Sequence, residues 1–129
     1  MTPDKIVRNF QRCVNWEEKY LYMIELGERF CTLESEKCTD DYRISGCQSQ
    51  VWISIDLDND CLKIKGMSDA AIVKGLIALI IIAFNGCSLD QAKTFDLQKW
   101  FNELVLTQHL TPSRAVGLSE IVKSVYNKL

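Results

Sequence analysis

The sequence predicts a single α+β domain in which a small antiparallel sheet of about three strands packs against helices. Apolar and polar residues alternate from Val51 to Asp58 and again from Cys61 to Lys65, which is typical of half-buried strands. The run from Ile72 to Phe84 contains only Lys74 as a charge, which is typical of a helix buried in the core. The chain has 129 residues, of which 47% are hydrophobic, and can therefore build one core, so we expect one domain over residues 1–129.

Two helices are expected before the sheet. Thr2 is a candidate cap for the first, with Pro3 at its opening position, and Asn15 is a candidate cap for the second, with Glu18 closing a capping box. Apolar residues recur at helical spacing in both, which indicates core-facing stripes: Ile6, Phe10 and Cys13 or Val14 in the first, then Trp16, Tyr20, Met23, Ile24 and Gly27 in the second. The polar, acidic segment from Thr32 to Asp41 predicts a loop.

The central part of the chain predicts a hairpin followed by the core helix. The turn Asp58-Asn59-Asp60 is short, so the two strands beside it should pair antiparallel. Residues Tyr42 to Ser45 are a candidate third strand. Ser68 is expected to cap a helix that begins at Asp69, and Gly75 within that helix permits the close approach of another backbone.

The remaining signals predict short helices and a longer last one. Asn85-Gly86 ends the core helix, and Ser88 with Gln91 resembles a capping box. Asp96 is a candidate cap for a helix over Leu97 to Val105. Thr111-Pro112 opens the last helix, which should run to the C-terminus.

Composition excludes several classes of function. The net charge of −2 argues against a nucleic-acid-binding protein, which needs a basic face. The thirteen-residue apolar run is too short for a bilayer, which needs about 20 such residues. No secretory signal pattern opens the chain, so we expect a cytoplasmic protein whose cysteines are thiols. The cysteines include no C-x-x-C pair and only one histidine accompanies them, so we expect no metal site.

The candidate functional residue is Cys47. It follows Gly46 and stands among serine and glutamine residues, directly before the apolar strand that begins at Val51. Polar neighbours and a glycine-permitted turn favour a displayed thiol over one that is packed in the core. Arg43 is the only cation near it in the sequence, so activation of the thiolate requires groups from elsewhere in the fold.

The motif around Cys47, Gly46-Cys47-Gln48-Ser49-Gln50-Val51-Trp52, resembles the core motif of the SufE family. The resemblance continues through Arg8-Asn9-Phe10, Asn15-Trp16-Glu17-Glu18-Lys19-Tyr20, Ser68-Asp69-Ala70-Ala71-Ile72-Val73-Lys74-Gly75 and Leu106-Thr107-Gln108-His109-Leu110-Thr111-Pro112-Ser113-Arg114. It covers nearly the whole chain, with departures at residues 31–41 and 85–91.

The resemblance implies a sulfur acceptor that takes a persulfide from a cysteine desulfurase onto Cys47 and stimulates that enzyme. It implies that the pyridoxal phosphate belongs to the desulfurase, that the chain needs no cofactor and is not a stand-alone enzyme, and that a downstream sulfur acceptor or iron–sulfur scaffold receives the sulfur. Further candidate site residues, for loop support or partner contact, are Gly46, Gln48, Gln50, Asp69 and Arg114.

Each of these residues also has an ordinary structural interpretation. Asp69 at a helix N-terminus simply supports the cap. Arg114 is poorly placed for the dipole of its own helix, which hints at another purpose, although a surface ion pair is an equal explanation. Two other functions remain open: a Cys-His hydrolase that pairs Cys47 with His109, and a metal or iron–sulfur scaffold that uses Cys47 and Asp69 as ligands.

Overall fold

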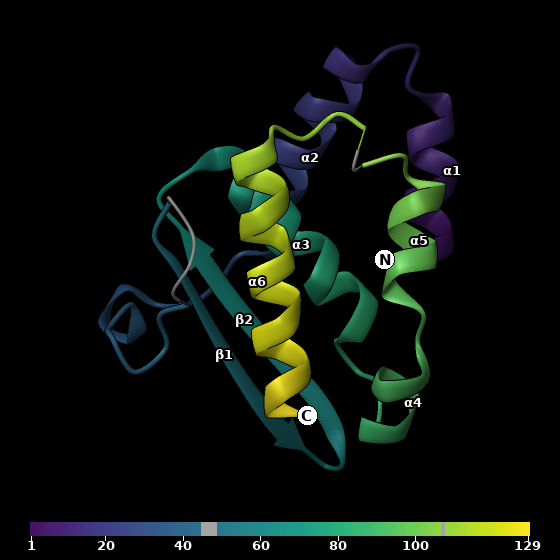
Figure 1. Ribbon diagram of the computed structural model, residues 1–129. Helices are drawn as coiled ribbons and strands as arrows, with labels where there is room; N and C mark the ends of the chain where they lie inside the picture. The colour runs from purple at the N-terminus through teal and green to yellow at the C-terminus, as the bar shows by residue number, and fades with distance from the viewer. Residues whose placement is uncertain (45–48, 107) are drawn as a thin grey trace.

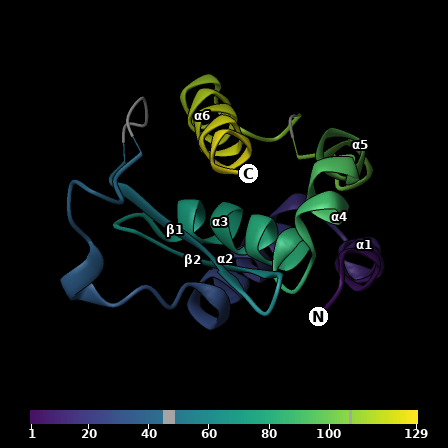
Figure 2. The same ribbon diagram turned by 90° about the horizontal axis from the view of Figure 1, so that it is seen from below.

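The computed structural model describes residues 1–44, 49–106 and 108–129. Its elements are α1 (Pro3–Arg12), α2 (Trp16–Phe30), the 3-10 turn η1 (Ser35–Lys37), β1 (Val51–Asp58), β2 (Cys61–Ser68), α3 (Ala71–Phe84), α4 (Leu89–Thr94), α5 (Leu97–Glu103) and α6 (Pro112–Lys128) (Figure 1). Figure 2 shows α3 in the middle of the molecule, with the hairpin beside it and α2 and α6 on opposite sides. The α+β prediction is confirmed.

The hairpin forms as the sequence predicts. β1 and β2 pair antiparallel, from Val51 opposite Ser68 to Asp58 opposite Cys61. Asn59 and Asp60 between them both have positive φ angles, 52° and 64°. Two successive residues of this kind form a type I′ turn, whose twist matches that of the strands it joins. β2 continues to Ser68, three residues beyond the predicted Lys65.

The expected third strand is reduced to a single bridge among the described residues. Arg43 pairs with Trp52, and the Ile44 N–H donates to the Val51 carbonyl oxygen at 2.8 Å. The N–H groups of residues 42 and 43 donate to carbonyl oxygens three residues earlier, in turns. Because these donors are used locally, the segment cannot extend a ladder along β1. Ser45, the last residue of the predicted strand, lies outside the described residues.

α3 is the core helix that its composition predicts. Its residues from Ile72 to Phe84 are buried except Lys74, whose ammonium lies 3.4 Å from the carboxylate of Glu28 on α2. A Cβ placed on Gly75 would lie 2.6 Å from the Met23 carbonyl oxygen. The backbones of α2 and α3 therefore touch at Gly75, which confirms the predicted close approach.

Most predicted helix ends are correct. Side chains of Thr2, Asn15, Ser88, Asp96 and Thr111 each accept a hydrogen bond from the backbone of the helix that follows, and Ser88 with Gln91 forms a full capping box. Glu18 does not close a box with Asn15, because its carboxylate accepts from the Val14 N–H instead. α5 ends at Glu103, before Val105, because the backbone of Val105 is left-handed with φ of 57°.

Two further predictions are wrong at the edges of helices. Val14 is 84% exposed, so it does not belong to the core stripe of α1, and Cys13 is only half-buried at the end of that helix. The helix predicted to begin at Asp69 begins at Ala71. No helix within the described ranges has both the length and the hydrophobicity needed to cross a membrane.

We expect Gly75→Ala to lower the free energy of unfolding by roughly 2 kcal/mol, because the added methyl group must push α2 away from α3. That loss exceeds the gain of about 1 kcal/mol in helix propensity when Ala replaces Gly. Urea denaturation followed by circular dichroism measures the difference. Glu25→Ala on the exposed side of α2 is the control and should change the free energy by less than about 0.5 kcal/mol. Equal stability of Gly75→Ala and wild type would contradict the tight contact.

Candidate functional site

The segment that carries Cys47 is held at its base by backbone hydrogen bonds. Ile44, which is 5% exposed, is anchored in the core before the segment and bonded to Val51 after it. Gly46, Cys47 and Gln48 lie outside the described residues. The structure therefore defines where this segment begins and ends, and which groups surround its two ends.

Asp69 holds the end of this segment that enters β1. Its Oδ1 accepts a hydrogen bond from the Gln50 N–H at 3.0 Å, and its own N–H donates to the Gln50 carbonyl oxygen at 3.3 Å. The Ser68 hydroxyl also donates to that carbonyl at 2.7 Å and accepts from the Ala70 N–H at 3.2 Å. The predicted capping role of Ser68 and Asp69 is wrong: α3 has no side-chain cap, and both side chains fix the backbone of Gln50.

A cavity of about 260 Å³ opens beside Ser49. Its apolar wall comes from α3 and from the inward side of α6, and its polar wall comes from the first turn of α6. The lining residues are Ser49, Val73, Leu76, Thr111, Ser113, Arg114, Gly117, Leu118 and Ile121. The structure thus brings Arg114 to the segment that carries Cys47, although the two are 67 positions apart in the sequence.

The cavity has a positive side. Arg114 is half-buried on its wall and forms no ion pair with any described residue. The N–H groups at the start of α6 add the positive end of a helix dipole, and the Thr111 hydroxyl accepts from one of them, that of Arg114, at 3.3 Å. The surface ion pair considered for Arg114 is therefore not formed with described residues. A guanidinium and a helix N-terminus together favour an anion.

Sequence reasoning identified Arg114 through its motif but missed the rest of this wall. Ser49 stands inside the Cys47 motif, yet only the fold shows that it meets α6. The sequence identifies Thr111 only as part of the opening of the last helix. The apolar residues Val73 and Leu76 carry no signal that separates them from the rest of the α3 core.

His109 lies in a different setting. Its ring stacks on Trp16 with centroids 4.2 Å apart and planes 12° apart, and its backbone N–H donates to the Leu106 carbonyl oxygen at 3.0 Å. It does not line the cavity beside Ser49. The stack fastens the chain between α5 and α6 to the start of α2, which gives His109 a packing role.

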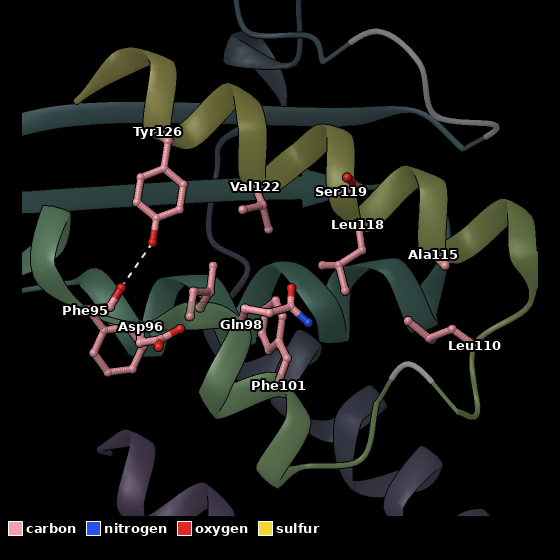
Figure 3. Close-up of a pocket in the computed structure, with 11 residues that line it drawn as sticks. Phe95, Asp96, Gln98, Phe101, Leu110, Ala115, Leu118, Ser119, Val122 and Tyr126 are labelled. Carbon is pink, nitrogen blue, oxygen red and sulfur yellow. Dashed lines mark hydrogen bonds between the residues drawn. The ribbon is translucent and has the colours of Figure 1, made fainter.

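A larger cavity of about 390 Å³ lies on the other side of α6, against α5 (Figure 3). Aromatic and aliphatic side chains make most of its wall. Two of its polar side chains are engaged elsewhere: Asp96 caps α5 and the Tyr126 hydroxyl donates to the Phe95 carbonyl oxygen at 3.3 Å. None of its lining residues is a nucleophilic cysteine, so its size does not make it the candidate site.

The described cysteines differ in how accessible their thiols are. Burial raises the pKa of Cys31 to about 12, and its thiol donates to the Lys74 carbonyl oxygen at 3.2 Å. Burial, followed by the charge of Glu18, raises the pKa of Cys13. Neither thiol forms a ready thiolate at neutral pH.

The alternative of a metal scaffold uses Cys47 and Asp69 as ligands. Among the described residues, no three His, Cys, Asp or Glu side chains gather as metal ligands. The carboxylate of Asp69 accepts the hydrogen bond from Gln50 instead.

We expect Asp69→Ala to lower the free energy of unfolding by about 1 to 2 kcal/mol, because the Gln50 N–H loses a charged acceptor. Asp69→Asn keeps an acceptor oxygen at the same position and should lose less than half as much. Thermal and urea denaturation of the two variants separate these outcomes. If Asp69→Ala were as stable as wild type, the bond to Gln50 would not hold the segment.

Two comparisons with known proteins complete the description of the site. The solution structure of a hypothetical protein from Thermus thermophilus is similar to this chain over 93% of its length and 89% of the other chain, with a TM-score of 0.61 and 17% identity, which shows a shared fold. The profile of SufE, the Fe-S metabolism associated domain, matches residues 4–129. The chain therefore belongs to the SufE family, whose domain is associated with Fe–S metabolism.

Proposed function

We propose that this protein accepts sulfur from a PLP-dependent cysteine desulfurase as a persulfide on Cys47. The observation that best supports the proposal is the cavity that the half-buried Arg114 shares with Ser49, which is two residues from Cys47 in the chain. Family membership supplies the link to Fe–S metabolism. The protein stimulates its donor and passes the sulfur on for iron–sulfur cluster assembly or related sulfur transfer.

The transfer is a displacement at sulfur. The Cys47 thiolate attacks the terminal sulfur of the persulfide on the desulfurase, a new S–S bond forms at Cys47, and the desulfurase cysteine leaves as a thiolate. The product on Cys47 carries its negative charge on the outer sulfur. Both the attacking thiolate and this product are anions, so a fixed positive group beside them lowers the free energy of each.

The contacts of the described residues support such a role for Arg114. Cys47 is two residues from Ser49, and consecutive Cα atoms are about 3.8 Å apart, so the tether between them spans at most about 7.6 Å. Arg114 and the start of α6 lie on the wall of the same cavity as Ser49. We assign to Arg114 the role of stabilising the anionic sulfur, and to the apolar wall of Val73 and Leu76 the role of excluding water and other thiols.

The remaining parts of the reaction belong to partners. The PLP is bound by the desulfurase, and this chain acts without a cofactor of its own and not as a stand-alone enzyme. Gly46, Gln48 and Gln50 are the residues that we expect to meet the desulfurase, since they flank the thiol that must enter its active site. A downstream acceptor or Fe–S scaffold then takes the sulfur in the cytoplasm.

The direct test is intact mass before and after incubation with a cysteine desulfurase and free cysteine. We expect the protein to gain the mass of one sulfur atom, on the peptide that contains Cys47, and a reductant to remove it. Cys47→Ser should show no gain and should lose stimulation of the desulfurase. Cys38→Ser is the matched control and should keep both, because Cys38 donates to the Glu34 carbonyl oxygen, outside the candidate site.

A gain of sulfur on another cysteine, or an essential second cysteine, would contradict direct acceptance by Cys47. Metal analysis of the same samples tests the scaffold alternative. Stoichiometric zinc or iron whose removal lowers the melting temperature would favour that alternative instead.

The role of Arg114 has its own test. We expect Arg114→Ala to slow sulfur transfer to Cys47 by roughly tenfold, the equivalent of about 1.4 kcal/mol, because one charged contact to the anionic sulfur is lost. Arg114→Lys should recover part of the rate. The control Arg12→Ala removes the same charge from the exposed end of α1 and should leave the rate unchanged. Rapid quenching followed by mass spectrometry gives these rates, and equal rates for Arg114→Ala and wild type would exclude the role.

A further inference from the structure

Two thiols, those of Cys61 and Cys87, lie at the end of the sheet away from the Cys47 segment. Cys61 is the first residue of β2, beside the hairpin turn, and Cys87 follows the end of α3. The Cys47 segment enters the sheet at Val51, which pairs with Ser68 at the opposite end of β2. Neither Cys61 nor Cys87 takes part in the sulfur transfer proposed above.

Hydrogen bonds bring the backbones of these two cysteines together. The Leu62 N–H donates to the Cys87 carbonyl oxygen at 2.7 Å, and the Leu62 carbonyl oxygen accepts from the Gly86 N–H at 2.9 Å. The Cα of Cys61 is about 2.4 Å from the nitrogen of Leu62, and the same spacing separates the carbonyl oxygen and Cα of Cys87. The two Cα atoms are therefore at most about 7.5 Å apart. Disulfides join Cα atoms about 4.4 to 6.8 Å apart, a range that lies below this upper bound, so the hydrogen bond is compatible with a bridge between the two cysteines.

The two thiols of the pair differ in their exposure. Cys61 is exposed and Cys87 is half-buried. Burial raises the pKa of Cys87, and the charge of Cys61 raises it further. The Cys87 thiol donates to the Ala83 carbonyl oxygen at 3.6 Å, a long contact that costs little to break.

We propose that Cys61 and Cys87 form a reversible disulfide when the protein meets a low-molecular-weight disulfide such as glutathione disulfide. The exposed Cys61 thiolate attacks one sulfur of the reagent, forms a mixed disulfide and releases one glutathione thiolate. Cys87 then loses its proton and attacks the Cys61 sulfur, which forms the Cys61–Cys87 bond and releases the second glutathione. Two electrons pass from the protein to the reagent, and the two thiol protons end on the two glutathione molecules.

The fold gives this bond a defined effect. It would close a loop over residues 61–87, which includes β2 and all of α3, and it would link two segments that the Leu62 hydrogen bonds already hold together. Cross-links between positions that are close in the native state lower the entropy of the unfolded chain and so stabilise the fold. Cys47 is left free, so the modification and sulfur acceptance involve different thiols.

The test uses the full chain in a Cys47→Ser background. Trypsin cuts after Lys63 and Lys74, so Cys61 and Cys87 lie on different peptides, whereas residues 47 and 61 share the peptide 44–63. After incubation with glutathione disulfide, we expect the intact mass to fall by about 2 Da, for the loss of two hydrogens. We also expect one cross-linked pair of tryptic peptides, and a melting temperature raised by roughly 5 to 10 °C. Dithiothreitol should reverse all three changes.

Single variants locate the bond. Cys61→Ser and Cys87→Ser, each added to the background, should abolish the 2-Da loss, and Cys87→Ser should instead accumulate one glutathione adduct on Cys61. Cys38→Ser, the matched control, should retain the loss. The proposal is overturned by glutathione adducts on Cys61 with no loss of 2 Da in the background protein, or by a loss that persists in Cys61→Ser. A melting temperature that falls on cross-linking would also overturn it, because the native fold would then hold the two positions apart.

Discussion

The contact between the backbones of α2 and α3 is the constraint on which the rest of the fold depends. A Cβ on Gly27 would lie 2.8 Å from the Gly75 nitrogen, and one on Gly75 would lie 2.6 Å from the Met23 carbonyl oxygen, so only glycine fits at either position without a shift. A Cβ on a third glycine, Gly66 on β2, would lie 2.5 Å from the side chain of Ile77 on α3. These glycines let a helix and a sheet approach α3 from two sides at once. That is why a helix with almost no polar residues can be buried in a chain of this size.

This apolar arrangement also determines the geometry of the candidate site. Because α2 and β2 fix α3, the first turns of α3 present Val73 and Leu76 to the cavity at a set position. Ser68 and Asp69 come directly before α3 and bond to Gln50, which is three residues after Cys47. The base of the Cys47 segment is therefore tied to the helix that forms the cavity wall. The cavity and the base of the segment that carries Cys47 are thus held in fixed positions relative to each other. This arrangement favours a defined approach of the thiol to the Arg114 side chain across the cavity.

The sequence predicts features that local side-chain patterns determine, and it fails where backbone turns or long-range contacts decide. The hairpin pairing, its turn and the helix caps Thr2, Asn15, Ser88 and Asp96 depend on residues within a few positions of one another, and these predictions are confirmed. The third strand failed because its N–H groups form turns with preceding residues, a competition that alternation of side chains does not reveal. Ser68 and Asp69 were predicted to be caps, but their partner is Gln50, 18 or 19 positions earlier. Arg114 was identified by family resemblance, whereas its neighbours Ser49 and Leu76 needed the fold.

The last helix borders both cavities described above. Leu118 lines both of them, Gly117 and Ile121 line the cavity beside Ser49, and Ala115, Ser119 and Val122 line the cavity against α5. Near the C-terminal end of α6, the Tyr126 hydroxyl bonds to Phe95 and the Lys128 ammonium lies 3.4 Å from the Ile53 carbonyl oxygen. Leu118 and Ile121 are buried in the middle of the helix. Empty space removes dispersion contacts, so the faces of α6 that line the cavities gain less packing energy than the faces that contact side chains. Arg114 is in the first turn of this helix, so the packing of α6 determines the position of the charged wall. Val73, Leu76 and the base of the Cys47 segment are held instead by α3 and the hairpin.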